Sequence, residues 1–232
     1  MNRSAHLLGI RDSELGWTLE VDAAVNAGKV ILTPAAARGQ GMVDKAAELA
    51  KKHGWFLARQ FENPANPAYH RNTTGPEILA DFVGKRLDFF VSGWGTGGTL
   101  TGAGEMIKLA RPEVQVVATE PESAQLLAGK PWAPHKIQGW TPDFLPAVLN
   151  RDIADRIVPV NDTEAIETAR KLARNEGIFC GISSGATFAA ALKVAREAPR
   201  GSVVLAVLPD TGERYLSTPL FEGIADGGDP EP

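Results

Sequence analysis

The residues best suited to chemistry lie in a glycine-rich segment near the middle of the chain. Residues 93–101 read Gly-Trp-Gly-Thr-Gly-Gly-Thr-Leu-Thr; they follow an apolar run at residues 88–92 and lead into a helical pattern at residues 99–110. Glycine lets the backbone approach a ligand closely, and the free amide groups at a helix start attract anions. The segment therefore predicts a phosphate-binding loop.

More than one phosphate ligand is compatible with this loop. Gly93, Gly95 and Gly98 satisfy the pattern G-x-G-x-x-G. Glu120 ends the next predicted strand, where a dinucleotide-binding fold places the acid that binds the ribose. An NAD-binding dehydrogenase is therefore one alternative, although three predicted strands precede or include the loop and that fingerprint normally opens its domain. A Walker-type nucleotide site is excluded, because no Gly-Lys-Ser/Thr follows.

Thiol and metal chemistry receive little support from the sequence. Cys180 is the single cysteine, which rules out an intrachain disulfide and a Cys-rich zinc site. Its flanking residues are apolar, so we expect it to pack in the core. The histidines lie far apart, with no His-x-x-x-His pair, and we expect no metal site at His6, His53, His70 or His135.

The pattern along the chain indicates which elements position the loop. Apolar β-branched runs alternate with amphipathic stretches, which predicts an α/β fold with a mostly parallel sheet and flanking helices. Strands are expected at residues 29–33, 55–59, 88–92, 115–119, 156–160 and 202–208, and helices at residues 42–53, 99–110 and 162–176. The last helix has Asp162 or Thr163 as its expected N-cap and Gly177 beyond its end. Residues 130–150 contain four prolines and are expected to be irregular.

Composition and charge exclude several classes of partner. The 232 residues are 44% apolar, enough for a sizeable core, and the net charge of −4 offers no field to attract nucleic acid or an anionic membrane. The longest apolar run, residues 203–208, is far shorter than the roughly 20 residues that cross a bilayer. The first ten residues lack the features of a secretory signal. We therefore expect a cytoplasmic protein with no nucleic-acid or membrane partner.

Six segments, in order and in register, carry a resemblance to a known family. They are residues 60–67 (QFENPANP), 70–78 (HRNTTGPEI), 95–99 (GTGGT), 134–139 (PHKIQG), 181–186 (GISSGA) and 208–217 (LPDTGERYLS). Together they resemble cysteine synthase, the O-acetylserine sulfhydrylase of the fold-type-II pyridoxal-phosphate group, over residues 30–221. Cystathionine β-synthase, a close relative, shares these motifs.

The resemblance assigns cofactor roles to two segments. It implies that the 5′-phosphate of pyridoxal 5′-phosphate is held by Gly95, Thr96, Gly97, Gly98 and Thr99, which agrees with the anion site inferred from the loop itself. It also implies that Ser183 meets the pyridine nitrogen. A hydroxyl there leaves the ring a weaker electron sink than an aspartate would. Ser184 could instead be an N-cap of the predicted helix.

Substrate contacts follow from the same resemblance. Gln60, at the end of the predicted strand 55–59, and Gly139, in a loop that closes over the amino acid, would bind the substrate. After Gly139 this chain has Trp-Thr-Pro-Asp-Phe, which is bulkier than the Gly-x-Gly-Ala-Gly-Phe of many members. For Asp210, Glu213 and Arg214, a salt-bridged strand end and a role beside the cofactor both stay open.

The implied reaction is β-replacement, in which O-acetylserine and sulfide give cysteine and acetate. The resemblance also implies a homodimer and serine acetyltransferase as a possible protein partner. Family members carry a Schiff-base lysine and a Ser/Thr-Gly-Asn loop upstream of the strand that matches residues 30–33. Neither motif occurs in residues 1–29, and Lys29 lacks the family's Ser-x-Lys context. We therefore expect no catalytic lysine in this chain and an impaired enzyme.

The expected domain organisation follows from the absence of these two motifs. Residues 1–29 are an unassigned segment, residues 30–65 a remnant of the smaller domain, residues 66–225 the larger cofactor-binding domain and residues 226–232 a flexible tail. Such a shortened chain has a second interpretation, a non-catalytic fragment that binds pyridoxal phosphate or a protein partner.

Overall fold

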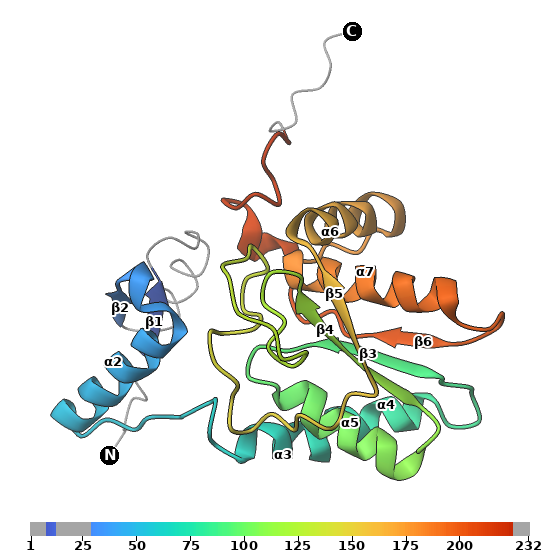
Figure 1. Ribbon diagram of the computed structural model, residues 1–232, viewed down its shortest axis with the longest axis horizontal. Coiled ribbons are helices and arrows are strands. Elements are labelled where there is room, and N and C mark those ends of the chain that lie inside the picture. Colours follow the sequence, from blue (N-terminus) through green and yellow to red (C-terminus); the bar gives the residue numbers. More distant parts are fainter. Residues whose placement is uncertain (1–7, 13–28, 225–232) are drawn as a thin grey trace, which may run out of the picture.

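The main body of the protein is a four-stranded parallel sheet. A computed structural model describes residues 8–12 and 29–224. The sheet contains β3 (Phe89–Gly93), β4 (Gln115–Pro121), β5 (Arg156–Val160) and β6 (Val204–Ala206), in the order β5-β4-β3-β6 (Figure 1). All neighbouring strands run parallel. This arrangement confirms the predicted α/β fold class.

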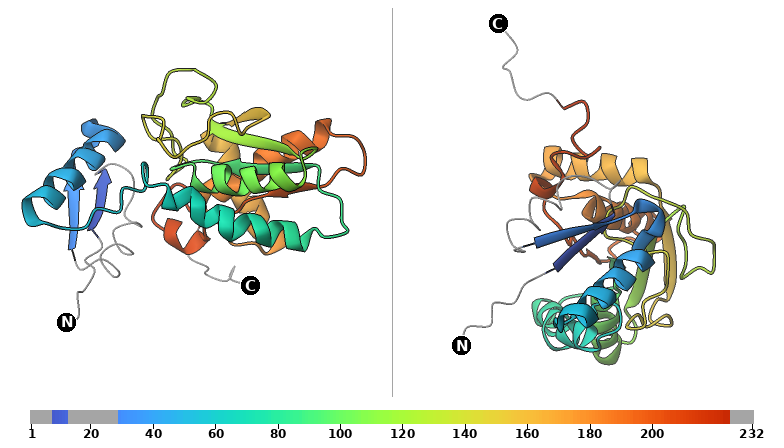
Figure 2. Two further views of the ribbon diagram at one scale, coloured as in Figure 1. Left: turned by 90° about the horizontal axis from the view of Figure 1, so that it is seen from below. Right: turned by 90° about the vertical axis from the view of Figure 1, so that its left-hand side faces the viewer.

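Helices cover both faces of this sheet. One face carries α3 (Ala65–Asn72), α4 (Thr74–Asp81) and α5 (Gly98–Ala110), and the other carries α6 (Asp162–Glu176) and α7 (Ile182–Glu197), as Figures 1 and 2 show. Side chains alternate between the two faces of a strand. Phe89 and Val91 accordingly pack toward α6 and α7, whereas Phe90 packs against α5. Because both faces are covered, the central strands are continuous apolar runs.

A smaller unit precedes the sheet. It consists of β1 (Leu8–Asp12), β2 (Lys29–Thr33) and α2 (Arg38–His53) (Figure 2). The two strands are parallel, with Leu8 opposite Lys29 and Asp12 opposite Thr33. Strand β1 was not predicted, because a short strand in a parallel pair depends on a partner distant in the sequence. Strand β2 has the predicted bounds, and α2 begins four residues before the predicted start.

Other expectations needed correction. The strand predicted at residues 55–59 is wrong: these residues have no regular structure, and the Phe56 side chain is 90% exposed. An apolar stretch forms a strand only beside a strand that can accept its hydrogen bonds, and the described residues place none there. Strand β6 is shorter than predicted. The N-cap of α6 is Asn161, whose side chain accepts a hydrogen bond from Glu164 N, and not Asp162 or Thr163.

Two further predictions concern residues outside the sheet. Residues 130–150 form an irregular segment without a helix, as predicted, and we call this segment the excursion. Residues 226–232, with the predicted flexible tail, and His6 lie outside the described residues. Among the helices of the described part of the chain, none has both the length and the apolar character needed to cross a membrane.

Candidate functional site

The glycine loop lies where the strand order of the sheet reverses. From β3 the chain moves to β4 and β5 on one side, and it returns through α7 to β6 on the other side of β3. Open parallel sheets bind ligands at such a switch point, outside the carboxyl ends of the strands. The segment after β3 and the segment after β6 meet there and line one cavity of about 330 Å³, which we call the loop cavity.

Residues from four segments line the loop cavity. They include Thr96 and Thr99 of the glycine loop, Gly139 and Trp140 of the excursion, Ser183 of α7, and Asp210 and Tyr215 after β6. The structure therefore brings together the predicted phosphate loop, the predicted partner of the ring nitrogen and one of the two predicted substrate contacts.

The glycines of the loop are required by their neighbours. A Cβ on Gly95 would lie 2.2 Å from the Gly139 carbonyl oxygen, and one on Gly98 would lie 1.9 Å from Asn66 Oδ1. Gly97 has φ +85°, which side chains rarely adopt, and its Cβ would lie 2.5 Å from Leu149. The loop is therefore packed from three sides, and only glycine fits at these positions.

Helix α5 presents its N-terminus to the cavity. Its N-cap residue is Gly97, which has no side chain to cap the first turn, and Gly98 N donates to the neighbouring Thr96 Oγ1 at 3.2 Å. The first amide groups of a helix have no partner within the helix, and they carry the positive end of its dipole. The loop therefore offers backbone donors and two threonine hydroxyls to an anion.

Side chains behind the loop hold its hydroxyl groups in place. Asn66 Nδ2 donates to Thr96 Oγ1 at 2.9 Å and to the Gln60 carbonyl oxygen at 2.9 Å. His70 lies between two threonines, with Nδ1 2.9 Å from Thr74 Oγ1 and Nε2 3.2 Å from Thr99 Oγ1. Burial lowers the pKa of His70 below its usual value, which favours the neutral ring.

His70 lies in one of the segments that carry the family resemblance, but its support of the loop was not predicted. The three histidines with described surroundings do not gather at one point. His70 lies behind the loop, and His135 Nε2 donates a hydrogen bond to the Thr141 carbonyl oxygen at 3.3 Å. In the described part of the chain, no three side chains of His, Cys, Asp or Glu gather as a metal site would require.

The first turn of α7 forms another part of the cavity wall. Ser183 is 4% exposed and lines the cavity, whereas Ser184 bonds to Asp210. Ser184 N donates to Asp210 Oδ1 at 3.1 Å, and the Ser184 hydroxyl donates to the same oxygen. The N-cap of α7 is Gly181, so Ser184 is not the N-cap residue. Ser183 is the serine that remains accessible from the cavity.

The excursion closes one side of the cavity. Trp140 is 7% exposed and packs on the loop, and Thr141 N donates to the Trp94 carbonyl oxygen at 2.9 Å. Trp132 Nε1 in turn donates to the Thr141 carbonyl oxygen at 2.8 Å. The bulky sequence after Gly139 is thus used to anchor the excursion against the strand end.

Two predicted residues lie away from the cavity. Gln60 is exposed and is not among the lining residues; only its carbonyl oxygen supports Asn66. Glu120 is fully buried, and its carboxylate accepts hydrogen bonds from Leu127 N at 2.8 Å and Ala128 N at 3.3 Å. A carboxylate held inside in this way cannot bind a ribose, which removes the structural basis of the NAD alternative.

Cys180 is buried in the core, as predicted. Burial, and secondarily the Asp210 carboxylate, raise the pKa of its thiol to about 11. The thiol therefore does not serve as a nucleophile near neutral pH.

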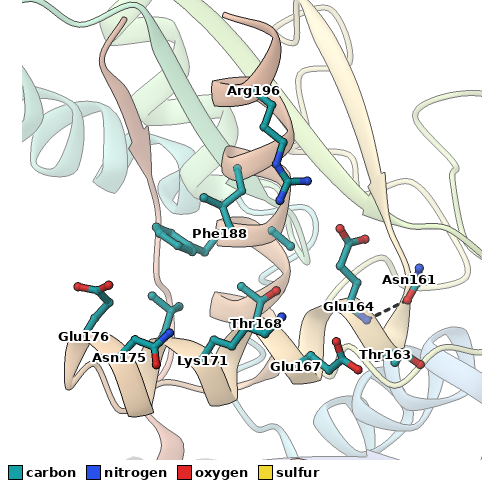
Figure 3. A pocket seen from close by; sticks show the side chains of 13 residues that line it. Asn161, Thr163, Glu164, Glu167, Thr168, Lys171, Asn175, Glu176, Phe188 and Arg196 are labelled. Carbon is teal, nitrogen blue, oxygen red and sulfur yellow. Dashed lines mark hydrogen bonds between the residues drawn. The ribbon is translucent and has the colours of Figure 1, made fainter. Parts of the chain in front are cut away.

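A larger hollow, of about 580 Å³, lies between α6 and α7 on the outer face (Figure 3). Figure 3 shows Glu164, Lys171 and Glu176 on α6, with Phe188 and Arg196 on α7. This groove contains none of the predicted site residues, and its polar side chains extend along its rim. Although this groove is larger than the loop cavity, we do not assign the functional site to it, because the backbone donors and the threonine and serine hydroxyls line the loop cavity.

Comparison with known proteins identifies relatives. A family model described as pyridoxal-phosphate dependent enzyme matches residues 18–210, which begins upstream of the resemblance at residue 30. The chain is 58% identical over 202 residues to O-ureido-L-serine synthase from Streptomyces lavendulae, covering 87% of this chain and 62% of that protein. It is 48% identical over 193 residues to cysteine synthase from Staphylococcus aureus (strain Mu50 / ATCC 700699), covering 83% of this chain and 62% of that protein.

Solved structures agree with these relatives. The crystal structure of an O-ureido-L-serine-bound mutant of O-ureido-L-serine synthase matches with a TM-score of 0.92 at 53% identity, covering 96% of this chain and 70% of that one. The crystal structure of cysteine synthase from Entamoeba histolytica matches with a TM-score of 0.83 at 34% identity, covering 96% of this chain and 66% of that one. The chain spans about three fifths of the length of the curated relatives it matches.

Proposed function

The chain belongs to the family of pyridoxal-phosphate-dependent enzymes, and we propose from this premise that its loop cavity binds pyridoxal 5′-phosphate for β-replacement on an O-substituted L-serine. The observation that carries the proposal is the convergence of the α5 N-terminus, the hydroxyls of Thr96 and Thr99, and Ser183 on one cavity. A phosphate and a pyridine nitrogen at opposite ends of one ligand would require this combination of groups.

The residues present fit this cofactor. No lysine or arginine is among the lining residues of the loop cavity in the described part of the chain, so neutral groups would bind the phosphate. Backbone amides at Gly97 and Thr99, with the α5 dipole, would stabilise an anion without a side-chain cation, whereas Gly98 N donates to Thr96 Oγ1 at 3.2 Å. A Cβ at Gly98 would displace Asn66 and disturb this arrangement.

Each side chain in the cavity has a proposed task. Thr96 and Thr99 bind phosphate oxygens, while Asn66 and His70 hold their hydroxyls from behind. When bound, the cofactor supplies an electron sink that weakens bonds at the substrate's α- and β-carbons. Ser183 binds the ring nitrogen.

The excursion has a proposed role in access to the site. Gly139 lies at the cavity, where its carbonyl oxygen is close to Gly95, and it would contact the amino-acid substrate. Trp140 covers the strand end beside it and keeps water away from the reacting atoms, which strengthens electrostatic interactions there. Gln60 stays a proposed substrate contact, one that would require its exposed side chain to turn toward the cavity.

We propose that the residues described here bind the cofactor without a covalent bond to lysine. The basis is that no lysine among residues 8–12 and 29–224 lines the loop cavity, together with the absence of the family's lysine motif from residues 1–29. The catalytic activity of these 232 residues alone would then be impaired, and the chain would act as a cofactor-binding or partner-binding polypeptide. A stoichiometric lysine adduct after borohydride reduction would contradict this proposal.

We propose two candidate reactions, which differ in the nucleophile that replaces the substituent of the serine. By its resemblance to cysteine synthase, the site would use O-acetylserine and sulfide to give cysteine and acetate. The 58% identity to O-ureido-L-serine synthase supports a second candidate, in which an oxygen nucleophile such as hydroxyurea gives O-ureido-L-serine. Both reactions replace the same substituent and differ in the atom that bonds to the β-carbon.

The experiment begins with equilibrium binding. Trp94 and Trp140 line the loop cavity, so pyridoxal 5′-phosphate should quench their fluorescence and compete with inorganic phosphate. Turnover of O-acetyl-L-serine is then measured with sulfide and with hydroxyurea in parallel. Saturable binding supports the cofactor site. Little or no turnover with either nucleophile supports the proposed impairment, and a preference for one nucleophile in the residual turnover decides between the two products. A chain that binds no pyridoxal phosphate would overturn the proposal.

Several further properties are proposed on the resemblance. The chain would be cytoplasmic and would form a homodimer, and it could associate with serine acetyltransferase. Exposed apolar side chains at Phe56 and Leu216 are compatible with protein contacts. We also propose that residues 30–65 and 66–225 are separate domains, because α2 lies with β1 and β2 to one side of the main sheet (Figure 2).

A further inference from the structure

The first turn of α2 contacts the excursion, although the two segments are far apart in the sequence. Gln40 N donates a hydrogen bond to Asp143 Oδ1 at 3.3 Å, across 103 positions. A Cβ on Gly39 would lie 2.8 Å from the same oxygen. The guanidinium carbon of Arg38 lies 4.9 Å from the centre of the Trp132 ring. Trp132 and Asp143 therefore hold the smaller unit against the excursion, and we call them the α2-binding pair.

The sequence of α2 does not provide its own N-terminal cap. Within Arg38–His53 no acidic residue lies in the first turn, and the N-cap residue Ala37 makes no side-chain hydrogen bond. The first amide groups of a helix carry partial positive charge, so a carboxylate close to them is favourable. Asp143 supplies both an acceptor and a negative charge from the excursion. The start of α2 is therefore stabilised by its contact with the main body of the protein.

The second member of the pair also contacts the wall of the loop cavity. Trp132 Nε1 donates to the Thr141 carbonyl oxygen at 2.8 Å, and Thr141 N donates to the Trp94 carbonyl oxygen at 2.9 Å. Trp94 lines the loop cavity, as do the two residues that precede Thr141, Gly139 and Trp140. One side chain thus connects the smaller unit to the segment that forms this wall.

Thr141 depends on these hydrogen bonds for its conformation. Its φ is +34°, which is unusual for a β-branched residue. A strained backbone of this kind persists only where the surrounding contacts impose it. The Thr141 carbonyl oxygen accepts from Trp132 Nε1 and from His135 Nε2, at 2.8 and 3.3 Å. Its hydroxyl is buried and has no hydrogen-bond partner among the described residues. The Thr141 turn is therefore held by its backbone bonds and not by its side chain.

These contacts occur where this chain differs from the glycine-rich pattern of many family members. In Gly-x-Gly-Ala-Gly-Phe, the positions that correspond to Thr141 and Asp143 are both glycine. Glycine adopts a positive φ without steric cost, and it has no carboxylate to place at a helix start. A chain with that pattern would neither need Trp132 to hold the turn nor cap α2 in this way.

We infer that Trp132 and Asp143 are positioning residues for the amino-acid side of the loop cavity. By holding the start of α2 and the Thr141 turn, they fix Gly139 and Trp140 at the cavity wall. The inference rests on the proposed function, in which Gly139 contacts the amino-acid substrate. A ligand that carries an amino acid beside the ring and the phosphate should depend on the α2-binding pair. Inorganic phosphate, which requires only the glycine loop, should not.

The test separates the amino-acid side of the site from the cofactor side. The probes are pyridoxal 5′-phosphate and phosphopyridoxyl-L-serine, a stable amine in which the serine nitrogen is bonded to the carbon that carries the aldehyde oxygen in pyridoxal phosphate. Inorganic phosphate is the third probe. None of the three requires a lysine for binding. Isothermal titration calorimetry gives each affinity, so the loss of a tryptophan in a variant does not affect the measurement.

The variants remove one contact at a time. Trp132→Phe keeps an aromatic ring facing Arg38 but removes the Nε1 donor, and Trp55→Phe, at an exposed indole outside the excursion, is its matched control. Asp143→Ala removes the cap of α2, and Glu113→Ala, at an exposed carboxylate between α5 and β4, is its control. Asp143 is only partly buried, so this variant keeps the test open if Trp132→Phe does not fold.

The expected result is a loss of preference for the probe that carries serine. The wild-type chain should bind phosphopyridoxyl-L-serine about tenfold more tightly than pyridoxal phosphate. Trp132→Phe and Asp143→Ala should each reduce this preference to about twofold, a change that corresponds to about one hydrogen bond. Both controls should retain it, and the affinity for inorganic phosphate should be equal in all chains. Adding Thr141→Gly to Trp132→Phe should restore most of the preference, because glycine adopts the turn without support.

The outcomes distinguish this inference from the proposed function. If the wild-type chain binds neither pyridoxal phosphate nor phosphopyridoxyl-L-serine, the cofactor site fails and the inference with it. If it binds both without preference, or if Trp132→Phe and Asp143→Ala retain the tenfold preference, the cofactor site stands and the inference is wrong. A purely structural role would lower the unfolding free energy of both variants, leave the preference unchanged and give Thr141→Gly nothing to restore.

Discussion

The indole ring of Trp140 lies on the backbone of Gly93, at the carboxyl end of β3. A Cβ on Gly93 would come within 1.9 Å of Trp140 Cζ2 and 2.1 Å of Cε2. Two segments almost fifty residues apart in the sequence are therefore in direct contact at the loop cavity. This contact joins the excursion to the strand that begins the glycine loop.

The first prediction uses this contact. Gly93→Ala should lower the free energy of unfolding by about 1–3 kcal/mol, because the added methyl group forces the indole out of its position. Trp140→Leu in the same chain should remove most of the additional cost of Gly93→Ala. Urea denaturation of the wild type, both single variants and the double variant measures the coupling. Strictly additive changes would show that the two residues do not interact.

The second prediction concerns the backbone of the loop. Gly97→Ala should abolish phosphate and pyridoxal phosphate binding, since φ +85° and the nearby Leu149 side chain both oppose a Cβ. Gly129→Ala is the control: it also has positive φ, at +72°, but nothing lies within 4 Å of its Cβ position. Titration followed by tryptophan fluorescence measures both. Equal loss of binding in the two variants would attribute the effect to general backbone strain.

The third prediction is a pH dependence of stability. Burial lowers the pKa of His70, so the unfolded chain binds more protons than the folded chain as the pH falls below about 6.5. Unfolding free energy should therefore decrease as the solution becomes acidic through this range. His70→Gln should make the decrease shallower, and His135, whose pKa burial also lowers, should account for part of what remains. Urea midpoints at pH 8.0 and 5.5 test this, and an unchanged slope in His70→Gln would count against it.

The fourth prediction separates the observed helix cap from the predicted ones. Asn161 Oδ1 accepts from Glu164 N at 2.9 Å, so Asn161→Ala should lower the unfolding free energy by about 1 kcal/mol. Thr163→Ala, on the exposed first turn of α6, should change it by a few tenths at most. Thermal and urea unfolding measure both variants. A larger loss for Thr163→Ala would assign the cap to the residue that the sequence suggested.

The fifth prediction concerns Cys180. With a thiol pKa of about 11, about one molecule in a thousand carries the thiolate at pH 8. The native chain should react very slowly with a thiol reagent such as iodoacetamide, and reaction should become rapid in denaturant. Because Asp210 contributes to the raised pKa, Asp210→Asn should react somewhat faster while still folded. Rapid labelling of the native wild-type chain would contradict the buried position.

Local sequence determined much of the fold. The bounds of β2, β5 and α6 were predicted because each is marked by signals within a few residues, such as β-branched runs or a glycine after a helix. The glycine loop was recognised for the same reason, since its anion-binding ability arises from consecutive residues between a strand and a helix. Burial of Cys180 followed from its apolar neighbours.

Pairing between distant segments was decided by the tertiary structure. Strand β1 forms because Leu8–Asp12 finds a parallel partner in β2, whereas residues 55–59 have suitable side chains but no strand beside them in the described part of the chain. The support of Thr99 by His70 and the contact of Trp140 with Gly93 also required the folded chain. Residue types and local periodicity report what a segment can form, but hydrogen bonds and packing between distant segments depend on where the whole chain places them. The sequence alone thus determined the loop and the elements on either side of it, and only the tertiary structure decided which side chains surround it.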